Sequence, residues 1–94
     1  MNYKLSYTDR FKETLSGINR EDTIRILKKL EWIAQNAEQL QHERLREPPE
    51  GLERICKCRV GFYRILYWIE HIKKEIIVYD VIWRKGRYKE LYRR

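Results

Sequence analysis

The hydrophobic and polar positions of the first forty residues predict one strand followed by two helices. Residues 3–7 alternate between apolar and polar side chains, as a half-buried strand does. A helix is predicted over residues 9–15 behind the N-cap Thr8, and a second one begins after the N-cap Asn19. The second helix is amphipathic and about four turns long. Its apolar face is formed by Ile26, Leu27, Leu30, Ile33, Ala34 and Ala37.

The second half of the chain has the period of strands rather than helices. A connector over residues 40–51 contains Pro48-Pro49, which cannot continue a helix, and we expect its His42 to be a solvated surface residue. Residues 54–60 alternate between apolar and basic side chains, Gly61 marks a turn, and a further strand runs through about Ile69. After a polar turn, residues 75–83 are rich in β-branched and aromatic side chains and predict a last strand.

The order β-α-α-β-β-β predicts an α+β fold. We expect two N-terminal helices to pack on one face of a mostly antiparallel four-stranded sheet. The length of 94 residues fits a single domain spanning residues 1–94, with a modest core.

Strand geometry separates basic from apolar side chains in the central segment. Successive side chains of a strand point to opposite faces, so Lys57 and Arg59 share one face with Ile55. The other face, which carries Cys56, Cys58 and Val60, can enter a core. Arg64 follows on the next strand, after the turn. Three cations on adjoining strands predict a rigid anion-binding site.

The net charge of +7 comes entirely from the second half of the chain. Residues 1–43 hold seven basic and seven acidic residues, whereas residues 44–94 hold fourteen basic and seven acidic ones. This asymmetry favours an anionic polymer as the ligand of one face. The alternative, that these residues are ordinary solubilising charge, stays open at this point.

Other classes of site have little support in the sequence. No apolar run approaches the roughly 20 residues of a membrane span, and the first residues have no signal core, so we expect a cytoplasmic protein. The two cysteines are too close for a disulfide and lack zinc-like partners, which favours buried free thiols. Phosphate-binding loops, paired carboxylates and nucleophile triads are absent. We therefore expect no metal and no cofactor.

Cleavage of RNA without a metal is compatible with the residues present. RNA carries its own nucleophile, the 2′-hydroxyl, and cations can stabilise the charge of a pentacoordinate phosphorane while a Tyr or Lys moves protons. Phosphate binding alone is the commoner use of such residues and stays open. The candidates in the converging segments are Lys57, Arg59, Arg64, Arg84, Arg87, Tyr88 and Tyr92.

Residues 58–67, Cys-Arg-Val-Gly-Phe-Tyr-Arg-Ile-Leu-Tyr, resemble the central motif of the RelE/ParE toxin superfamily. The resemblance extends over essentially the whole chain, including the order of elements and the basic tail. It implies a toxin of a type II toxin–antitoxin system, bound by a cognate antitoxin that wraps it. In the RelE branch such toxins cut mRNA at the ribosome without metal. In the ParE branch they poison DNA gyrase instead.

The resemblance also implies roles for individual residues. Arg64 matches the arginine that holds the scissile phosphate, and Lys57 falls where the RelE branch keeps a lysine for proton transfer or charge stabilisation. Ile55 stands where a further lysine can occur in that branch. Two roles fall in the tail, and each has two candidate residues. The second arginine is Arg84 or Arg87, and the stacking tyrosine is Tyr88 or Tyr92. The implied catalytic residues are Lys57, Arg64, Arg84, Arg87 and Tyr92, and the implied RNA-binding residues are Arg59, Lys85, Tyr88 and Lys89.

The sequence is thus interpreted as a metal-independent, ribosome-dependent mRNA endonuclease that inhibits translation. Its expected partners are the antitoxin, the ribosome and mRNA, with no membrane and no small-molecule cofactor. The alternative is a toxin without nuclease activity that binds gyrase, or an inactive nucleic-acid-binding relative.

Overall fold

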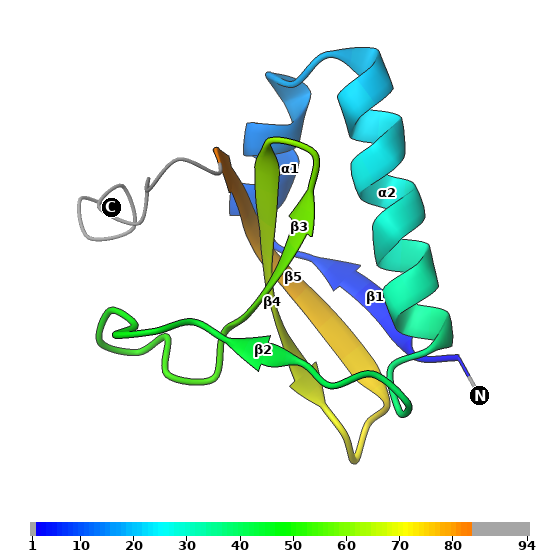
Figure 1. Ribbon diagram of the computed structural model, residues 1–94, viewed down its shortest axis with the longest axis vertical. Coiled ribbons are helices and arrows are strands. Elements are labelled where there is room, and N and C mark those ends of the chain that lie inside the picture. Colours follow the sequence, from blue (N-terminus) through cyan, green and yellow to red (C-terminus); the bar gives the residue numbers. More distant parts are fainter. Residues whose placement is uncertain (1, 84–94) are drawn as a thin grey trace.

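Seven regular elements make up the described part of the chain. The structure is a computed structural model, and it describes residues 2–83. Its elements are β1 (Lys4–Tyr7), α1 (Asp9–Ser16), α2 (Arg20–Gln35), β2 (Glu43–Arg44), β3 (Cys56–Val60), β4 (Tyr63–Glu70) and β5 (Glu75–Trp83). The strands join one sheet in the order β1-β5-β4-β3-β2 (Figure 1). The predicted α+β class is confirmed.

The sheet has five strands, however, where the sequence predicts four. The additional strand is β2, which lies in the predicted connector and pairs Glu43 with Lys57 and Arg44 with Cys56. Two residues are too few for a period-2 pattern to be recognised. The sheet is also mixed, because β1 runs parallel to β5 while the other three pairs are antiparallel. A pairing between the first and last described strands cannot be read from local sequence.

Side-chain caps fix the beginnings of both helices, as predicted. The Thr8 hydroxyl accepts a hydrogen bond from the Phe11 N–H at 3.1 Å, and the Asn19 side chain accepts one from the Asp22 N–H at 2.9 Å. The Thr8 hydroxyl also donates to the Tyr79 carbonyl at 2.6 Å, which ties the start of α1 to β5. Within residues 2–83, no helix is both long and apolar enough to cross a membrane.

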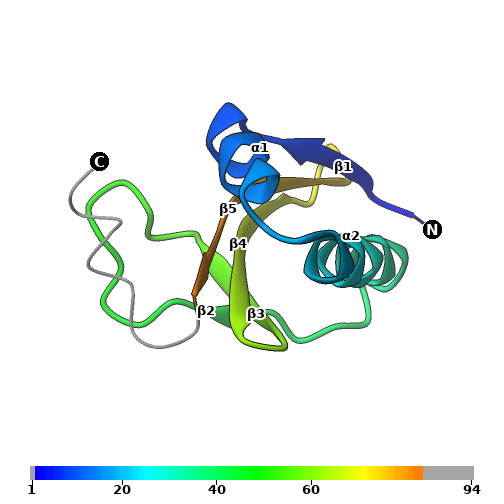
Figure 2. The ribbon, with the colours of Figure 1, turned by 90° about the horizontal axis from the view of Figure 1, so that it is seen from above.

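Both helices contribute to the core on one face of the sheet, α1 through Phe11 and α2 through its apolar face. In Figure 2 the sheet is seen nearly edge-on, with α2 on one side and the loop between β2 and β3 on the other. The core under the helices joins the apolar face of α2 to alternate residues of the strands. Its fully buried members are Phe11, Ile26, Leu30, Ile33, Ile65, Ile76 and Val78.

The opposite face of the sheet holds a second, smaller core. Its buried residues are Leu66 and Ile82 of the sheet and Leu45 and Ile55 at the two ends of the loop over residues 45–55, with Leu52 of the same loop packed against them. Ile55 is only 2% exposed, although the sequence places it on the same face as the cations. The prediction of one apolar and one cationic face is therefore incomplete. The cations occupy only the part of this face that the loop leaves open.

The expectation that His42 is a solvated surface residue is wrong. His42 is half-buried, and its two ring nitrogens lie 2.8 Å from the Ala37 carbonyl and 2.7 Å from the Tyr67 hydroxyl. Because a carbonyl can only accept, Nε2 carries a proton and donates to Ala37; in the neutral imidazole Nδ1 then accepts from the Tyr67 hydroxyl. The histidine thereby joins the end of α2 to the centre of β4. A loop residue whose partner on the sheet lies 25 positions away gives no periodic signal in the sequence.

Alkaline pH is expected to destabilise the fold through Tyr67. Burial, followed by the neighbouring Cys56 and Cys58 thiols, raises the pKa of Tyr67 above its ordinary value of 10.0. The folded state then keeps this proton at a pH where the unfolded state has lost it, so the contribution of Tyr67 to stability is full below about pH 10 and is lost as the pH rises further. The loss approaches about 1.4 kcal/mol per pH unit for one group. Denaturant unfolding between pH 8 and 11 measures this slope.

The matched variant for this measurement is Tyr67→Phe. It should be less stable at pH 7 by about 1 kcal/mol, since His42 Nδ1 loses its donor. Above pH 10 it should lose stability less steeply than the unsubstituted protein. Parallel curves for the two proteins over this range would show that Tyr67 does not carry the alkaline dependence.

Candidate functional site

A tight hairpin aligns the candidate cations. Gly61 has a φ of +56° and is the first of the two residues that join β3 to β4, the position at which a two-residue hairpin turn favours glycine. This turn pairs Val60 with Tyr63 and, in the next row, Arg59 with Arg64. The hairpin therefore sets the register on which the anion site depends.

Lys57, Arg59 and Arg64, here called the cation cluster, lie on one face of the sheet as predicted. Arg59 and Arg64 are direct cross-strand partners, and Lys57 is two residues from Arg59 on the same strand. Side chains in direct pairs have Cβ atoms about 5 Å apart, and like charges in that position repel. A bound anion would relieve this repulsion. The cluster lines a hollow of about 160 Å³ together with Glu43 and Cys58.

Lys57 has a charged partner that the sequence interpretation missed. Its side chain is 18% exposed, and its Nζ lies 3.7 Å from a carboxylate oxygen of Glu43 on β2. Glu43 is itself largely exposed, so the pair sits at the rim of the hollow. No local signal reveals this carboxylate, because it reaches the cluster only through the unpredicted strand β2.

Glu43→Gln is expected to strengthen the binding of single-stranded RNA by about twofold to fivefold, because the carboxylate competes with phosphate for Lys57. The gain should shrink at high salt, which screens exposed charges. Fluorescence anisotropy with a labelled oligonucleotide measures it, and Glu31→Gln on the exposed surface of α2 is the matched control. Equal affinities for the Glu43→Gln and Glu31→Gln variants would show that Glu43 does not oppose RNA binding.

A buried ion pair stands next to the cation cluster. Asp80 on β5 is 2% exposed and accepts a hydrogen bond from the Arg10 Nε at 3.0 Å and one from the Val81 N–H at 2.8 Å. The Arg10 Nη1 donates to the Tyr79 hydroxyl at 2.6 Å, and the guanidinium lies 4.9 Å from the centre of that ring. Asp80 pairs across the sheet with Leu66, which lies two residues after Arg64 on β4 and therefore on the same face. Arg10 thus neutralises an acidic group beside the cluster.

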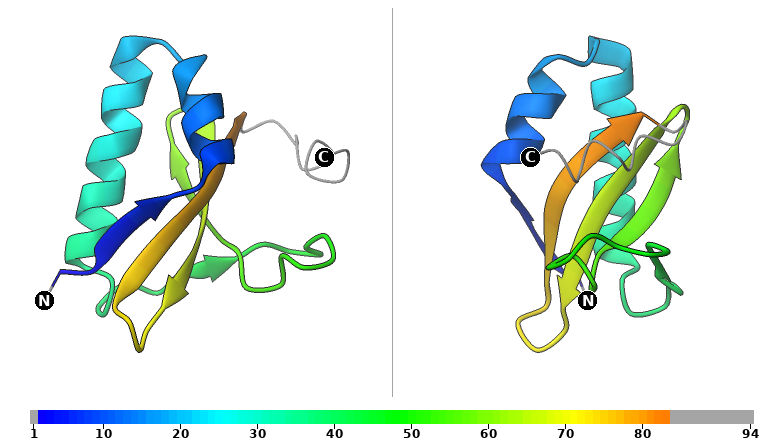
Figure 3. Two further views of the ribbon diagram at one scale, coloured as in Figure 1. Left: turned by 180° about the vertical axis from the view of Figure 1, so that it is seen from behind. Right: turned by 90° about the vertical axis from the view of Figure 1, so that its left-hand side faces the viewer.

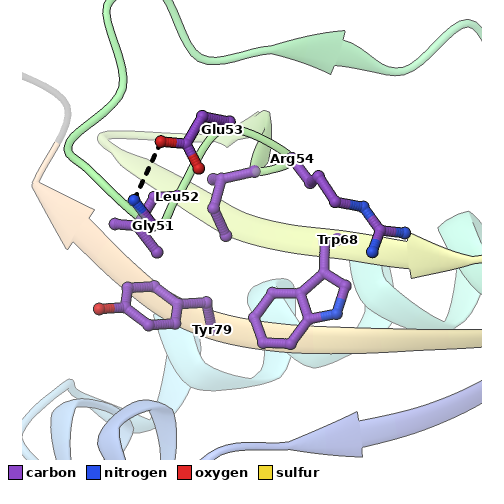
Figure 4. A pocket seen from close by; sticks show the side chains of 7 residues that line it. Gly51, Leu52, Glu53, Arg54, Trp68 and Tyr79 are labelled. Carbon is purple, nitrogen blue, oxygen red and sulfur yellow. Dashed lines mark hydrogen bonds between the residues drawn. The ribbon is translucent and has the colours of Figure 1, made fainter.

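A second hollow, of about 240 Å³, opens further along the same face. Figure 4 shows the Trp68 and Tyr79 rings forming its floor and the loop backbone its wall, with the Gly51 N–H donating to Glu53. The two ring centres are 6.3 Å apart and tilted by 48°. Its lining is mostly apolar, with Arg54 near the mouth. It can hold a small flat or apolar group, but it has no feature that selects one.

The remaining predicted site residues lie outside the described residues. These are Arg84, Lys85, Arg87, Tyr88, Lys89 and Tyr92. Of the predicted set, the structure therefore brings together Lys57, Arg59 and Arg64. Over residues 2–83 there is no group of three or more His, Cys, Asp or Glu side chains that could hold a metal ion. Both cysteines are free thiols; Cys56 is buried, Cys58 is half-buried, and burial raises the pKa of each.

Fold and site together define a small α+β protein with a fixed cationic patch on an otherwise covered sheet face. A family model described as the ParE toxin of the type II toxin–antitoxin system parDE matches residues 5–88. The chain therefore belongs to this family, within the RelE/ParE superfamily, and is a type II toxin. Among curated proteins, no match is found.

Several solved structures that contain RelE toxins have the same fold. The RelBE2 toxin–antitoxin complex of Mycobacterium tuberculosis has a TM-score of 0.75 at 18% identity, covering 89% of this chain and 93% of that one. A mutant of E. coli RelE in the free state has a TM-score of 0.70 at 19% identity, covering 99% and 93%. The archaeal RelE–RelB complex of Pyrococcus horikoshii OT3 has a TM-score of 0.70 at 20% identity, covering 93% and 99%. At these identities the likeness establishes the fold alone.

Proposed function

We propose that this toxin is a metal-independent, ribosome-dependent mRNA endonuclease. The observation that carries the proposal is the cation cluster, which gathers Lys57, Arg59 and Arg64 on one open patch of the sheet. Three fixed cations within reach of one phosphodiester supply the charge that a phosphorane transition state requires. The likeness of the fold to RelE toxins supports the same reaction class.

The proposed reaction is an attack of the RNA 2′-oxygen on the adjacent phosphorus. The new O–P bond forms as the P–O5′ bond breaks; the 2′-hydroxyl loses its proton and the leaving 5′-oxygen gains one, which leaves a 2′,3′-cyclic phosphate and a 5′-hydroxyl. Arg64 holds the scissile phosphate, Lys57 stabilises the added charge or moves a proton, and Arg59 supports the backbone. Among the residues outside the described part, Arg84 or Arg87 and Tyr88 or Tyr92 complete the set, with Lys85 and Lys89 as further RNA contacts. No metal or cofactor takes part.

A cognate antitoxin is the proposed protein partner. Three of the solved relatives are complexes of a RelE-type toxin with its antitoxin, from Mycobacterium tuberculosis, Pyrococcus horikoshii and Methanococcus jannaschii. Because this chain has an excess of basic residues, we expect an acidic or amphipathic segment of the antitoxin to cover the cation cluster. Co-purification with the product of a neighbouring small gene tests this partner, and a lack of affinity would count against it.

The second candidate function is inhibition of DNA gyrase without nuclease activity. It is favoured by one observation, that the matching family model is the one for ParE toxins. On this alternative the cation cluster would contact gyrase rather than mRNA.

Two assays on the same purified protein separate the candidates. The endonuclease proposal predicts that mRNA is cut during translation while gyrase supercoils plasmid DNA normally. A 2′-deoxy substitution at the cut site should abolish that cut, since it removes the nucleophile. Inhibited supercoiling with intact mRNA would transfer the assignment to the gyrase-binding alternative.

A further inference from the structure

A hollow of about 220 Å³ lies between α2 and β3. It is lined by residues 32–33 of α2, residues 40–43 of the loop after this helix, residues 57–59 of β3 and Tyr67 of β4. Figures 1 and 3 show β3 running beside α2, and contacts between residues join the two elements. This space is called the edge hollow.

The edge hollow lies along a stretch of β3 that has no neighbouring strand on that side. β2 pairs with only the first two residues of β3, because the hydrogen bonds of His42 hold the preceding chain near the end of α2. Within residues 2–83, β3 is therefore an open edge of the sheet from Cys58 onward. The two faces of the sheet meet at such an edge. This is why Lys57 and Arg59, whose side chains lie on the face away from the helices, line the same hollow as Trp32.

Two observations connect the edge hollow with the cation cluster. The hollow of the cluster and the edge hollow share four lining residues, Glu43, Lys57, Cys58 and Arg59. In addition, burial raises the pKa of the Cys58 thiol and the Lys29 ammonium of α2 opposes this rise, which requires Lys29 to lie near Cys58. A strand whose phosphates lie on the cluster can therefore pass around the open edge of β3 toward α2.

Trp32 places an exposed aromatic ring in the edge hollow. It is 46% exposed, so much of its indole surface can contact a ligand, and the Lys29 Nζ lies 4.3 Å from the ring centre. The ring thus has one cation beside it on α2 and two more across the hollow, Lys57 and Arg59 on β3. Glu43 is the one acidic residue among the described residues of the lining, and it is already paired with Lys57. The hollow therefore combines a flat apolar surface with positive charge on both sides.

We propose that Trp32 stacks on an unpaired base of the RNA strand whose scissile phosphate lies on the cation cluster, and that Lys29 contacts a phosphate next to that base. Proteins hold single strands in this way, because cations bind the backbone and aromatic rings bind the bases. The positive charge on both sides of the ring favours RNA over an apolar peptide as the occupant. Since every base has a flat face, the contact lengthens the binding site without selecting a sequence. This assignment deepens the proposed function, on which it rests for the choice of RNA.

The experiment measures binding of a fluorescent 2′-O-methyl octanucleotide, which lacks the nucleophile and cannot be cut. Trp32→Ala should weaken binding by about tenfold, within the range that alanine substitution gives for base stacking. Trp32→Leu keeps an apolar side chain without a ring and should lose as much, whereas Trp32→Phe should bind nearly as the unsubstituted protein does. Ile24→Ala on the same helix and Phe62→Ala in the hairpin turn remove exposed apolar side chains that line neither hollow, and both should leave affinity unchanged.

The salt dependence distinguishes stacking from charge. The Trp32 variants should keep the slope of log affinity against log salt, whereas Lys29→Gln should reduce it by about 0.7, the value for one phosphate contact on a single strand. An octanucleotide with abasic positions should bind the unsubstituted protein and the Trp32→Ala variant alike. Full affinity of Trp32→Leu, or a loss in Trp32→Ala that persists on the abasic strand, would overturn the proposal. So would a lack of binding by the unsubstituted protein at low salt.

Failure of this inference and failure of the proposed function give different results. If mRNA is cut during translation but Trp32→Leu binds RNA normally, the endonuclease assignment stands and the stacking proposal is wrong. If Trp32→Leu loses affinity for gyrase or for the antitoxin while its RNA binding is unchanged, the occupant is a protein and the proposal is again wrong. If Trp32→Leu loses RNA affinity and the unsubstituted protein cuts no mRNA, stacking stands without the nuclease.

Discussion

Replacing Asp80 with alanine is expected to lower the free energy of unfolding by about 3–5 kcal/mol, the usual cost of removing one partner from a buried ion pair. Asp80 accepts from the Arg10 guanidinium and from the Val81 N–H, and its side chain is 3% exposed. In the variant, the Arg10 charge would keep its partly buried position without a counter-charge. For a domain whose total stability lies in the usual range of about 5–15 kcal/mol, this is a large fraction.

Denaturant unfolding of purified protein measures the effect. The free energy of unfolding of Asp80→Asn should lie between those of the unsubstituted protein and Asp80→Ala. The amide oxygen can still accept a hydrogen bond from the Val81 N–H, but the negative charge is lost. Lys74→Ala, which breaks the exposed ion pair with Glu38, is the matched control and should leave stability nearly unchanged. A loss for Asp80→Ala no larger than that of this control would contradict the account of the pair.

Arg64→Ala is expected to reduce mRNA cleavage on programmed ribosomes by at least about 100-fold, as removal of one transition-state donor does in other enzymes. The expected cause is loss of the group in the cation cluster that holds the scissile phosphate. Arg64→Lys should recover only part of the activity, since it restores the charge but not the two-pronged geometry of a guanidinium. Cleavage rates under single-turnover conditions give the comparison.

Two controls make this result specific. The unfolding transition of Arg64→Ala should match that of the unsubstituted protein closely enough for both to be folded in the assay. Arg25→Ala removes an exposed cation from α2, away from the cluster, and should keep full activity. Full cleavage by a folded Arg64→Ala protein would remove Arg64 from the proposed mechanism.

Local sequence was sufficient for the parts of the fold that local physics determines. The caps at Thr8 and Asn19, the apolar face of α2 and the turn at Gly61 each depend on residues within a few positions. The alternation over residues 54–60 correctly assigned Lys57 and Arg59 to one face, because the period of a strand is independent of its partners.

The features that the sequence did not predict all depend on distant partners. β2 exists only because Glu43 and Arg44 pair with β3, and the second core exists because the loop over residues 45–55 packs against the sheet. The Asp80–Arg10 pair joins residues 70 positions apart in the chain. Such contacts are set by tertiary packing, which leaves no period or motif in one sequence.

The most direct test of the central claim is primer extension on a defined mRNA in a translating extract, with the unsubstituted protein and Arg64→Ala side by side. The account predicts cuts within the translated region that appear only with the unsubstituted protein and disappear when initiation is blocked. Translation inhibited without cuts, or equal cutting by Arg64→Ala, would contradict the claim that the cation cluster cleaves mRNA at the ribosome.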